Sequence, residues 1–237
     1  MRIKGIIFDK DGTLLKFKEF WIPVARAAAE SVLQETGCPK DAADEMLRAA
    51  GAYDGINGKL CSGTYADIAD AFEVTIKKRH PGCTAENIYD ITRSAFEECV
   101  KYGEIIPVCK NIKNVMENLK CRGISLFLVT TDEYEITKKC LDELGITEYF
   151  DGIYTDDGEG KTKPDPYFIY RIEEESGLAP EELLMVGDTL TDIEFANNGG
   201  IAAVGVAYAG EDKKILGKGA AAIIDDISQL EEILNEI

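Results

Sequence analysis

Apolar residues follow two rhythms along this 237-residue chain, one typical of buried strands and one typical of helices. Runs that are apolar at nearly every position predict strands buried on both faces of a sheet. They occupy residues 3–8, 124–129, 152–154, 183–186, 201–206 and 222–224. Elsewhere apolar residues recur every three or four positions. This spacing predicts helices over residues 20–36, 41–50, 64–79, 84–102, 109–122, 133–144, 165–177 and 191–198, with one more at the end of the chain.

The order of these elements divides the chain into two parts. No strand-like run lies between residues 20 and 102, whereas strands and helices alternate from residue 107 onward. Strands that are apolar throughout and alternate with helices are typical of a doubly wound parallel sheet. We therefore expect an α/β fold whose Rossmann-like core comprises residues 1–15 and 106–237. An all-helical domain, residues 16–105, is expected to be inserted after the first strand.

The charge of the chain excludes several classes of partner. Aspartate and glutamate total 44 against 26 lysines and arginines, a net charge of −18. Nucleic acids and anionic membrane surfaces are bound by clustered basic residues, so neither is expected as a partner. No apolar stretch approaches the ~20 residues that span a bilayer, and the first residues do not resemble a signal peptide. We expect a cytoplasmic protein, and the sequence leaves its oligomeric state open.

Cysteine and histidine usage narrows the chemistry further. Seven cysteines with no CxxC pair favour reduced thiols over a disulfide framework or a zinc site. A single histidine, His80, argues against Ser-His-Asp catalysis, Cys-His catalysis and zinc sites with several histidines. Catalysis would therefore depend on carboxylates, lysines and hydroxyl groups.

Polar residues follow the predicted strands at the point where each strand ends. In a doubly wound sheet these ends share one edge, and ligands bind there. The residues expected to converge at this edge are Asp9, Asp11, Thr130, Lys163, Asp188 and Asp192. Carboxylates crowded together at pH 7 repel one another and need a cation. Oxygen ligands without imidazole suit Mg²⁺, which commonly binds a substrate phosphate as well. This edge is therefore a candidate metal and phosphate site.

Four segments at these strand ends resemble, in order, the four motifs of the haloacid dehalogenase (HAD) superfamily. The first is DKDGTL at residues 9–14, and the second is Thr130 after its strand. The third is Lys163 followed by proline, although Lys161 and Lys138 are alternative lysines for it. The fourth is GDTLTD at residues 187–192. The helical insertion resembles the first cap class of this superfamily, as in phosphoglycolate phosphatases.

The resemblance implies an aspartyl-phosphate mechanism. Asp9 would be the nucleophile, and Asp11 would be the general acid and then the general base. Mg²⁺ would bind the Asp9 carboxylate, the Asp11 backbone carbonyl and Asp188. Asp192 would support the metal, directly or through water, or orient Lys163.

Phosphate binding is implied for three further residues. Thr130 and Lys163 would bind the phosphoryl group of the substrate. Thr131 would contribute a backbone N–H to it, in a position where many relatives have asparagine.

The resemblance favours a phosphatase, a hydrolase that acts on a small phosphorylated metabolite such as phosphoglycolate. The second aspartate, Asp11, distinguishes this sequence from metal-free dehalogenases and from ion-pumping ATPases. A phosphomutase of the β-phosphoglucomutase type, or a catalytically idle binding module on the same fold, remains an alternative. Within the inserted domain, Lys59, Ser62 and Thr64 follow or lie in the loop of residues 51–63. This loop is a candidate for substrate selection, or it only joins helices.

Overall fold

The computed structural model describes residues 3–54, 58–83, 86–156, 161–208 and 213–236. The chain divides into two compact units, one made of residues 1–16 and 105–237 and the other of residues 17–104. These boundaries lie one residue inside the predicted limits of the helical insertion. Across the described ranges, no helix combines the length and the apolar character needed to cross a membrane.

The first unit is built on a sheet of six parallel strands in the order β3-β2-β1-β4-β5-β6. The strands are β1 (Gly5–Phe8), β2 (Ser125–Val129), β3 (Gly152–Tyr154), β4 (Leu183–Gly187), β5 (Ala202–Val206) and β6 (Ala222–Ile224). Strand β1 lies between β2 and β4, so that Ile7 is opposite both Phe127 and Met185. The predicted α/β fold with a doubly wound parallel sheet is confirmed.

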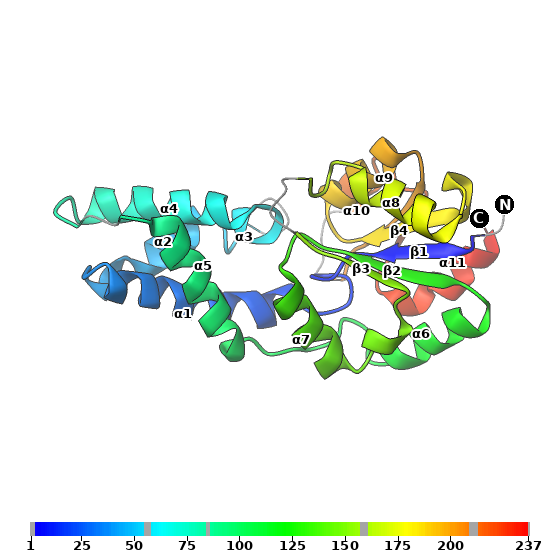
Figure 1. The fold of residues 1–237 in the computed structure, drawn as a ribbon, viewed down its shortest axis with the longest axis horizontal. Helices are drawn as coiled ribbons and strands as arrows, with labels where there is room; N and C mark the ends of the chain where they lie inside the picture. The colour runs from blue at the N-terminus through cyan, green and yellow to red at the C-terminus, as the bar shows by residue number, and fades with distance from the viewer. Residues whose placement is uncertain (1–2, 55–57, 84–85, 157–160, 209–212, 237) are drawn as a thin grey trace. The chain divides into compact units, whose positions relative to one another are not determined.

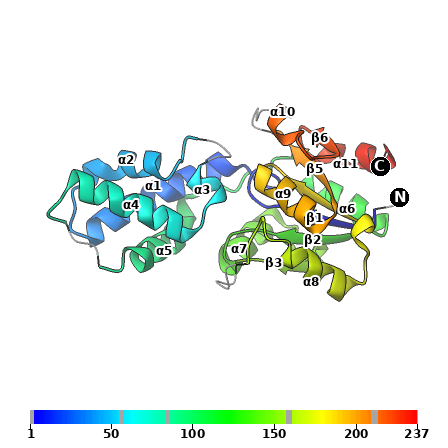
Figure 2. The same cartoon turned by 90° about the horizontal axis from the view of Figure 1, so that it is seen from above.

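Helices cover both faces of this sheet. They are α6 (Ile112–Cys121), α7 (Tyr134–Leu144), α8 (Tyr167–Ser176), α9 (Leu190–Gly199), α10 (Lys213–Leu216) and α11 (Leu230–Glu236), with short 3-10 turns at η4 (Thr147–Tyr149), η5 (Pro180–Glu182) and η6 (Ile227–Gln229). Helices α8 and α9 lie side by side over one face in both views (Figures 1 and 2), and α6, α7 and α11 lie on the opposite face. On that face Asn118 of α6 donates a hydrogen bond to Glu231 of α11.

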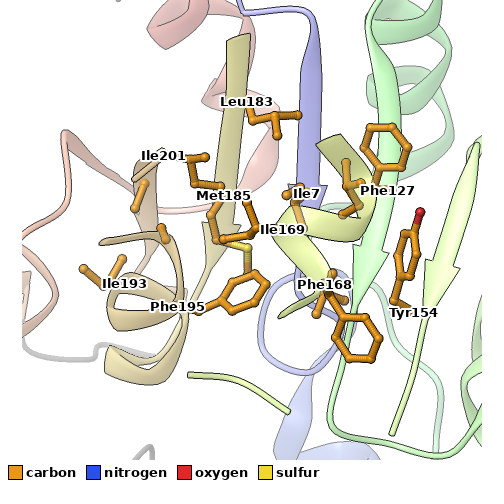
Figure 3. Close-up of a cluster of buried hydrophobic side chains, with 14 residues drawn as sticks. Ile7, Phe127, Tyr154, Phe168, Ile169, Leu183, Met185, Ile193, Phe195 and Ile201 are labelled. Atoms are coloured by element: carbon orange, nitrogen blue, oxygen red, sulfur yellow. The ribbon is translucent and has the colours of Figure 1, made fainter. Parts of the chain in front are cut away.

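Alternation along the strands explains how the sheet holds a helix layer on each face. Successive side chains of a strand point to opposite faces, and Ile7 belongs to the layer beneath α8 and α9. Figure 3 shows Phe168 and Ile169 of α8 and Phe195 of α9 in this layer, together with side chains from β1, β2, β3 and β4. The flanking residues Ile6 and Phe8 are also fully buried. Burial on both faces is the reason that β1 is apolar throughout.

The second unit is helical in all of its described regular elements. They are α1 (Phe17–Glu35), η1 (Lys40–Ala42), α2 (Ala43–Ala49), α3 (Lys59–Ser62), α4 (Tyr65–Arg79), α5 (Ile88–Cys99) and η3 (Val100–Tyr102). Phe96 of α5 is central to its aromatic core. Its ring centroid lies 6.2 Å from Trp21, 6.4 Å from Phe72 and 5.6 Å from Tyr65. These contacts join α1, α4 and α5 through ring packing.

Helix α1 continues through a proline. Pro23 has no N–H to donate to the carbonyl of Glu19, four residues earlier in the helix. The N–H of Glu104 donates to that carbonyl instead, over 3.1 Å. The carbonyl is therefore satisfied by the end of the unit, and the helix remains continuous over Phe17–Glu35.

Helix α3 lies within the segment that was predicted as a loop. It is a single turn, and the N–H of Leu60 donates to the carbonyl of Ala50 over 2.8 Å. The backbone approach is close, because a Cβ on Gly58 would lie 2.0 Å from the carbonyl oxygen of Gly51. A contact with the residues that follow α2, seven to ten positions earlier in the chain, therefore stabilises this turn. Helix α10 was not predicted either, and it too has only four residues.

Replacing Phe195 with alanine tests the core beneath α8 and α9. The side chain is fully buried, and Phe→Ala in a packed core costs about 3–5 kcal/mol of unfolding free energy. Urea unfolding monitored by circular dichroism would measure this loss. Tyr170→Ala on α8 is the control, because Tyr170 is 52% exposed and should change stability by no more than ~0.5 kcal/mol. Equal losses in the two variants would contradict the packing.

Candidate active site

Three neighbouring strands place polar residues at one edge of the sheet. Asp9 directly follows β1, Thr130 follows β2 and Asp188 follows β4. The N–H of Asp9 donates to the carbonyl of Val186 over 2.9 Å, and the N–H of Thr130 donates to the carbonyl of Tyr154 over 3.0 Å. The sheet hydrogen bonding thus continues to the residues that bear the functional side chains. All three are at least nine-tenths buried.

Lys163 reaches this edge from the segment between β3 and α8. Its Nζ lies 2.6 Å from Oδ1 of Asp9 and 2.6 Å from Oδ1 of Asp192. The other two lysines considered for this role lie elsewhere. The Nζ of Lys161 is 4.4 Å from the centre of the Tyr167 ring, and Lys138 pairs with Asp142 on an exposed face of α7.

Burial and charge set the ionisation of this group. Burial raises the pKa of Asp9 to about 7, and the carboxylates of Asp192 and Asp11 add to the rise while Lys163 opposes it. Burial lowers the pKa of Lys163, but Asp192 and Asp9 more than offset this, so its pKa lies above the ordinary value. Lys163 is therefore a cation at neutral pH. A further cation beside Asp9 would stabilise its carboxylate form.

Asp192 occupies a fixed position at the start of α9. Thr189 is the N-cap, and Oδ2 of Asp192 accepts from its N–H over 3.0 Å and from its hydroxyl over 2.8 Å. The N–H of Asp192 donates back to the Thr189 hydroxyl over 3.4 Å, which completes a capping box. Because Oδ1 accepts from Lys163, both carboxylate oxygens are engaged within the protein. Asp192 thus contacts Lys163 through one oxygen and caps α9 through the other.

Three carboxylates nevertheless approach closely enough to share a metal ion. Asp9, Asp188 and Asp192 each offer one oxygen, and these oxygens lie within 4.8 Å of one another. Asp11 is expected to contribute its backbone carbonyl rather than its carboxylate. Its side chain lies against Lys10 instead, with Oδ2 of Asp11 2.7 Å from the Lys10 Nζ.

Lys10 and Asp132 are site residues to which the sequence analysis assigned no role. The Lys10 Nζ also lies 2.8 Å from Oδ2 of Asp132, and the Lys10 side chain is fully buried. Burial lowers the pKa of Lys10, but Asp11 and Asp132 raise it well above its ordinary value. Hydrophobic patterning cannot reveal such a lysine, because lysine after a strand is ordinarily exposed. The one feature of the sequence that could have indicated a buried Lys10 is its position between the two aspartates of the first motif.

The two threonines after β2 differ in burial. The Thr130 hydroxyl oxygen accepts from the N–H of Asp132 over 3.3 Å, which leaves the hydroxyl hydrogen to be donated to a ligand. Thr131 is partly exposed in the turn that follows.

Three residues of the helical unit were expected to contribute to substrate selection. Lys59 begins α3 and is exposed, while the side chain of Ser62 lies outside the described part of the structure. Thr64 is the N-cap of α4, where its hydroxyl donates to Oδ2 of Asp67 over 2.8 Å and accepts from the N–H of Asp67 over 3.3 Å. Helix capping therefore accounts for Thr64.

The chain is similar to known proteins in sequence and in fold. A phosphoglycolate phosphatase of Pseudomonas putida is 25% identical over 229 residues, which is 95% of this chain and 77% of that protein. A predicted phosphoglycolate phosphatase from Haemophilus somnus has a similar structure, with a TM-score of 0.76 and 22% identity over 98% of each chain. The HAD-hydrolase YfnB from Bacillus subtilis, bound to magnesium, gives a TM-score of 0.71 and 20% identity over 99% of this chain and 100% of that one.

A family model extends the comparison across most of the chain. The model of the haloacid dehalogenase-like hydrolases matches residues 3–200, which include all four motif segments and the helical unit. The chain belongs to the haloacid dehalogenase-like hydrolase family.

Proposed function

We propose that the protein is a Mg²⁺-dependent phosphatase that hydrolyses a small phosphorylated metabolite through an aspartyl-phosphate on Asp9. The observation that supports this most directly is the placement of Asp9. Its carboxylate is held against the Lys163 ammonium at 2.6 Å and approaches the Asp188 and Asp192 carboxylates. A carboxylate beside a cation and a potential metal site can act as a nucleophile toward a phosphoryl group.

The residues present fit a magnesium ion. Mg²⁺ prefers oxygen ligands, typically one or two carboxylates with water and a substrate phosphate, and Asp9 and Asp188 would supply the carboxylates. The Asp11 backbone carbonyl would be a third protein ligand. Gly12 leaves room for this arrangement, because a Cβ there would lie 1.9 Å from Oδ2 of Asp188. Bound in this place, the ion would supply positive charge to the phosphoryl oxygens.

In the first step, an oxygen of the Asp9 carboxylate attacks phosphorus, and the bond from phosphorus to the leaving oxygen breaks. Asp11, in its protonated form, donates a proton to that oxygen, so that an alcohol leaves. Lys163 and the Thr130 hydroxyl bind the phosphoryl oxygens as charge develops on them. Groups held in place before the reaction stabilise this charge without reorganising.

In the second step, water hydrolyses the aspartyl-phosphate. Asp11, now a carboxylate, takes a proton from the water as it attacks phosphorus, and the bond between phosphorus and the Asp9 oxygen breaks. Inorganic phosphate leaves, Asp9 is again a carboxylate, and Asp11 is again protonated. Atoms and protons therefore balance over the cycle.

Charge distribution bears on the substrate. Residues 1–15 and 106–237 contain 15 basic and 29 acidic side chains, whereas residues 16–105 contain 11 and 15. The catalytic unit therefore has most of the negative charge and would repel an anionic substrate, unless Lys163 and a metal ion reverse the field locally. A small phosphate monoester fits, because its charged group can lie within the region where Lys163 and a metal ion supply positive charge. Phosphoglycolate is the first compound to test, because the Pseudomonas putida relative is a phosphoglycolate phosphatase.

Replacing Asp9 with asparagine tests the nucleophile. The amide retains the size of the carboxylate but cannot form the aspartyl-phosphate, so phosphate release from phosphoglycolate and from p-nitrophenyl phosphate should fall to background. Asp225→Asn is the control, because Asp225 is a solvent-exposed carboxylate of the same unit that pairs with Lys213. Colorimetric phosphate release would measure both variants. Turnover by the Asp9 variant at the parent rate would contradict the mechanism.

Removing divalent metal tests the cofactor. The buried carboxylates at Asp9 and Asp188 need a cation to bind a phosphate dianion, so excess EDTA should abolish phosphate release. Addition of Mg²⁺ beyond the EDTA should restore it. Circular dichroism recorded in EDTA separates loss of metal from loss of fold. Full turnover in excess EDTA would exclude a metal requirement.

Replacing Gly12 with alanine tests the space around Asp188. Its φ is +85°, and the added Cβ would displace the Asp188 carboxylate. A misplacement of about 1 Å can cost roughly 10²-fold in rate, so we expect a loss of that order and a higher Mg²⁺ requirement. Gly123→Ala is the matched control, because its φ is +76° and no heavy atom lies within 4 Å of the new Cβ. Equal activity in both variants would contradict the proposed crowding at Asp188.

A further inference from the structure

Lys10 is buried at the same edge of the sheet as Lys163. Its described ion pairs do not involve the carboxylates that contact Lys163. Its side chain has no exposed surface, and its ammonium lies between Asp11 and Asp132, 2.7 Å and 2.8 Å from their respective Oδ2 atoms. Removing an ammonium from water costs several kcal/mol unless well-placed partners compensate. The fold therefore places this lysine between two carboxylates at a definite point.

The position of Lys10 is set by contacts other than Asp11. Its backbone carbonyl accepts from the N–H groups of Leu14 and Leu15, over 2.9 Å and 3.2 Å, in the turn that follows β1. Its second partner, Asp132, is also held by its backbone. The N–H of Asp132 donates to the Thr130 hydroxyl, and its carbonyl accepts from the N–H of Asp156 over 3.0 Å. The ammonium thus joins the loops after β1 and β2, and the loop after β3 supports Asp132 through its backbone.

A third ionisable group near Lys10, the thiol of Cys140, does not compete for its charge. Cys140 of α7 is fully buried, and burial raises the pKa of its thiol to about 12. The thiol is therefore neutral near pH 7 and does not pair with the ammonium as the two carboxylates do. Asp11 itself is partly exposed, with 14% of its side-chain surface accessible. Without a partner, its χ1 torsion would have three staggered orientations and its χ2 torsion a broad range.

We propose that Lys10 is a positioning residue, which, anchored by Asp132, holds the Asp11 carboxylate in the orientation from which it exchanges protons with the leaving group and with water. This inference rests on the proposed function, because Asp11 is the general acid and base in that mechanism. It assigns Lys163 to the nucleophile and Lys10 to the acid–base residue. Each lysine pairs with its own two carboxylates, Lys163 with Asp9 and Asp192 and Lys10 with Asp11 and Asp132.

The simpler alternative is that Lys10 only neutralises buried charge. A double variant separates the two roles. Lys10→Met removes one positive charge, and Asp132→Asn removes one negative charge, so the pair leaves the net charge of the cluster unchanged. If Lys10 only balances charge, the double variant should recover the parent activity. If Lys10 positions Asp11, the double variant should not recover it. The double variant also keeps the test open if Lys10→Met alone fails to fold.

The experiment compares the parent enzyme with K10M, D132N, K10M/D132N and the control K138M. Lys138 is an exposed lysine of α7 that pairs with Asp142. Thermal unfolding would report stability, and steady-state phosphate release with Mg²⁺ would report kcat and KM separately. Crystal structures of the parent and the double variant would report the position of the Asp11 carboxylate, a readout that needs no turnover.

Positioning predicts that K10M/D132N recovers stability relative to K10M but keeps a kcat reduced by roughly tenfold to a hundredfold, since a general acid–base group contributes about 10²–10⁴-fold. KM should stay close to that of the parent and of K138M, because Lys10 makes no contact assigned to phosphate binding. The Asp11 carboxylate should leave its parent position by more than ~0.5 Å, the tolerance of a productive catalytic geometry.

Two results would overturn the inference. One is recovery of the parent kcat in K10M/D132N, which would leave Lys10 with charge balance alone. The other is an unchanged Asp11 carboxylate in the crystal structure of that variant. If the parent lacks phosphatase activity, the proposed function fails, and the crystallographic comparison still decides whether Lys10 holds Asp11.

Discussion

The chemistry of this sheet edge depends on one interaction, the contact of the buried Lys163 ammonium with the carboxylates of Asp9 and Asp192. Two like charges about 4 Å apart repel by roughly 4 kcal/mol at an effective dielectric constant of ~20, and Asp188 adds a third carboxylate to the group. The Lys163 ammonium contacts two of these carboxylates, at 2.6 Å each, and its single positive charge reduces their repulsion. A divalent cation bound by Asp9 and Asp188 would offset the negative charge that one ammonium leaves.

A second buried lysine divides the acidic residues into two groups. Lys163 contacts Asp9, the proposed nucleophile, whereas Lys10 contacts Asp11. Lys10 lies one residue along the chain from each of these two aspartates. The division matters because the two aspartates have different tasks in the proposed cycle. A nucleophile must stay ionised, while an acid–base residue must alternate between protonated and ionised forms. Separate cationic partners allow each environment to differ although the residues are neighbours in sequence.

Strand positions could be predicted from the sequence because burial on both faces makes a strand apolar throughout, as at Ile6, Ile7 and Phe8. Once the strands were located, their shared direction implied that Asp9 and Asp188 meet. Hydrophobic patterning failed where a backbone contact outside the helix decides local structure, as at α3, where the N–H of Leu60 donates to the carbonyl of Ala50. It also failed for Lys10, since the same residue type is ordinarily exposed and its burial follows from loops that meet only in three dimensions.

Strand β1 lies at the centre of the sheet and fixes the position of the backbone at Asp9. Ile7 is packed between Phe127 and Met185 in register, and Asp9 follows only two residues later with its N–H bonded to Val186. Packed interiors adapt poorly to displacement, so the backbone at Asp9 cannot shift without disturbing both neighbouring strands. Electrostatic catalysis requires groups that are already in place when charge develops. The motif residues therefore lie where the sheet is most constrained, and the side chains that must change protonation extend from its edge.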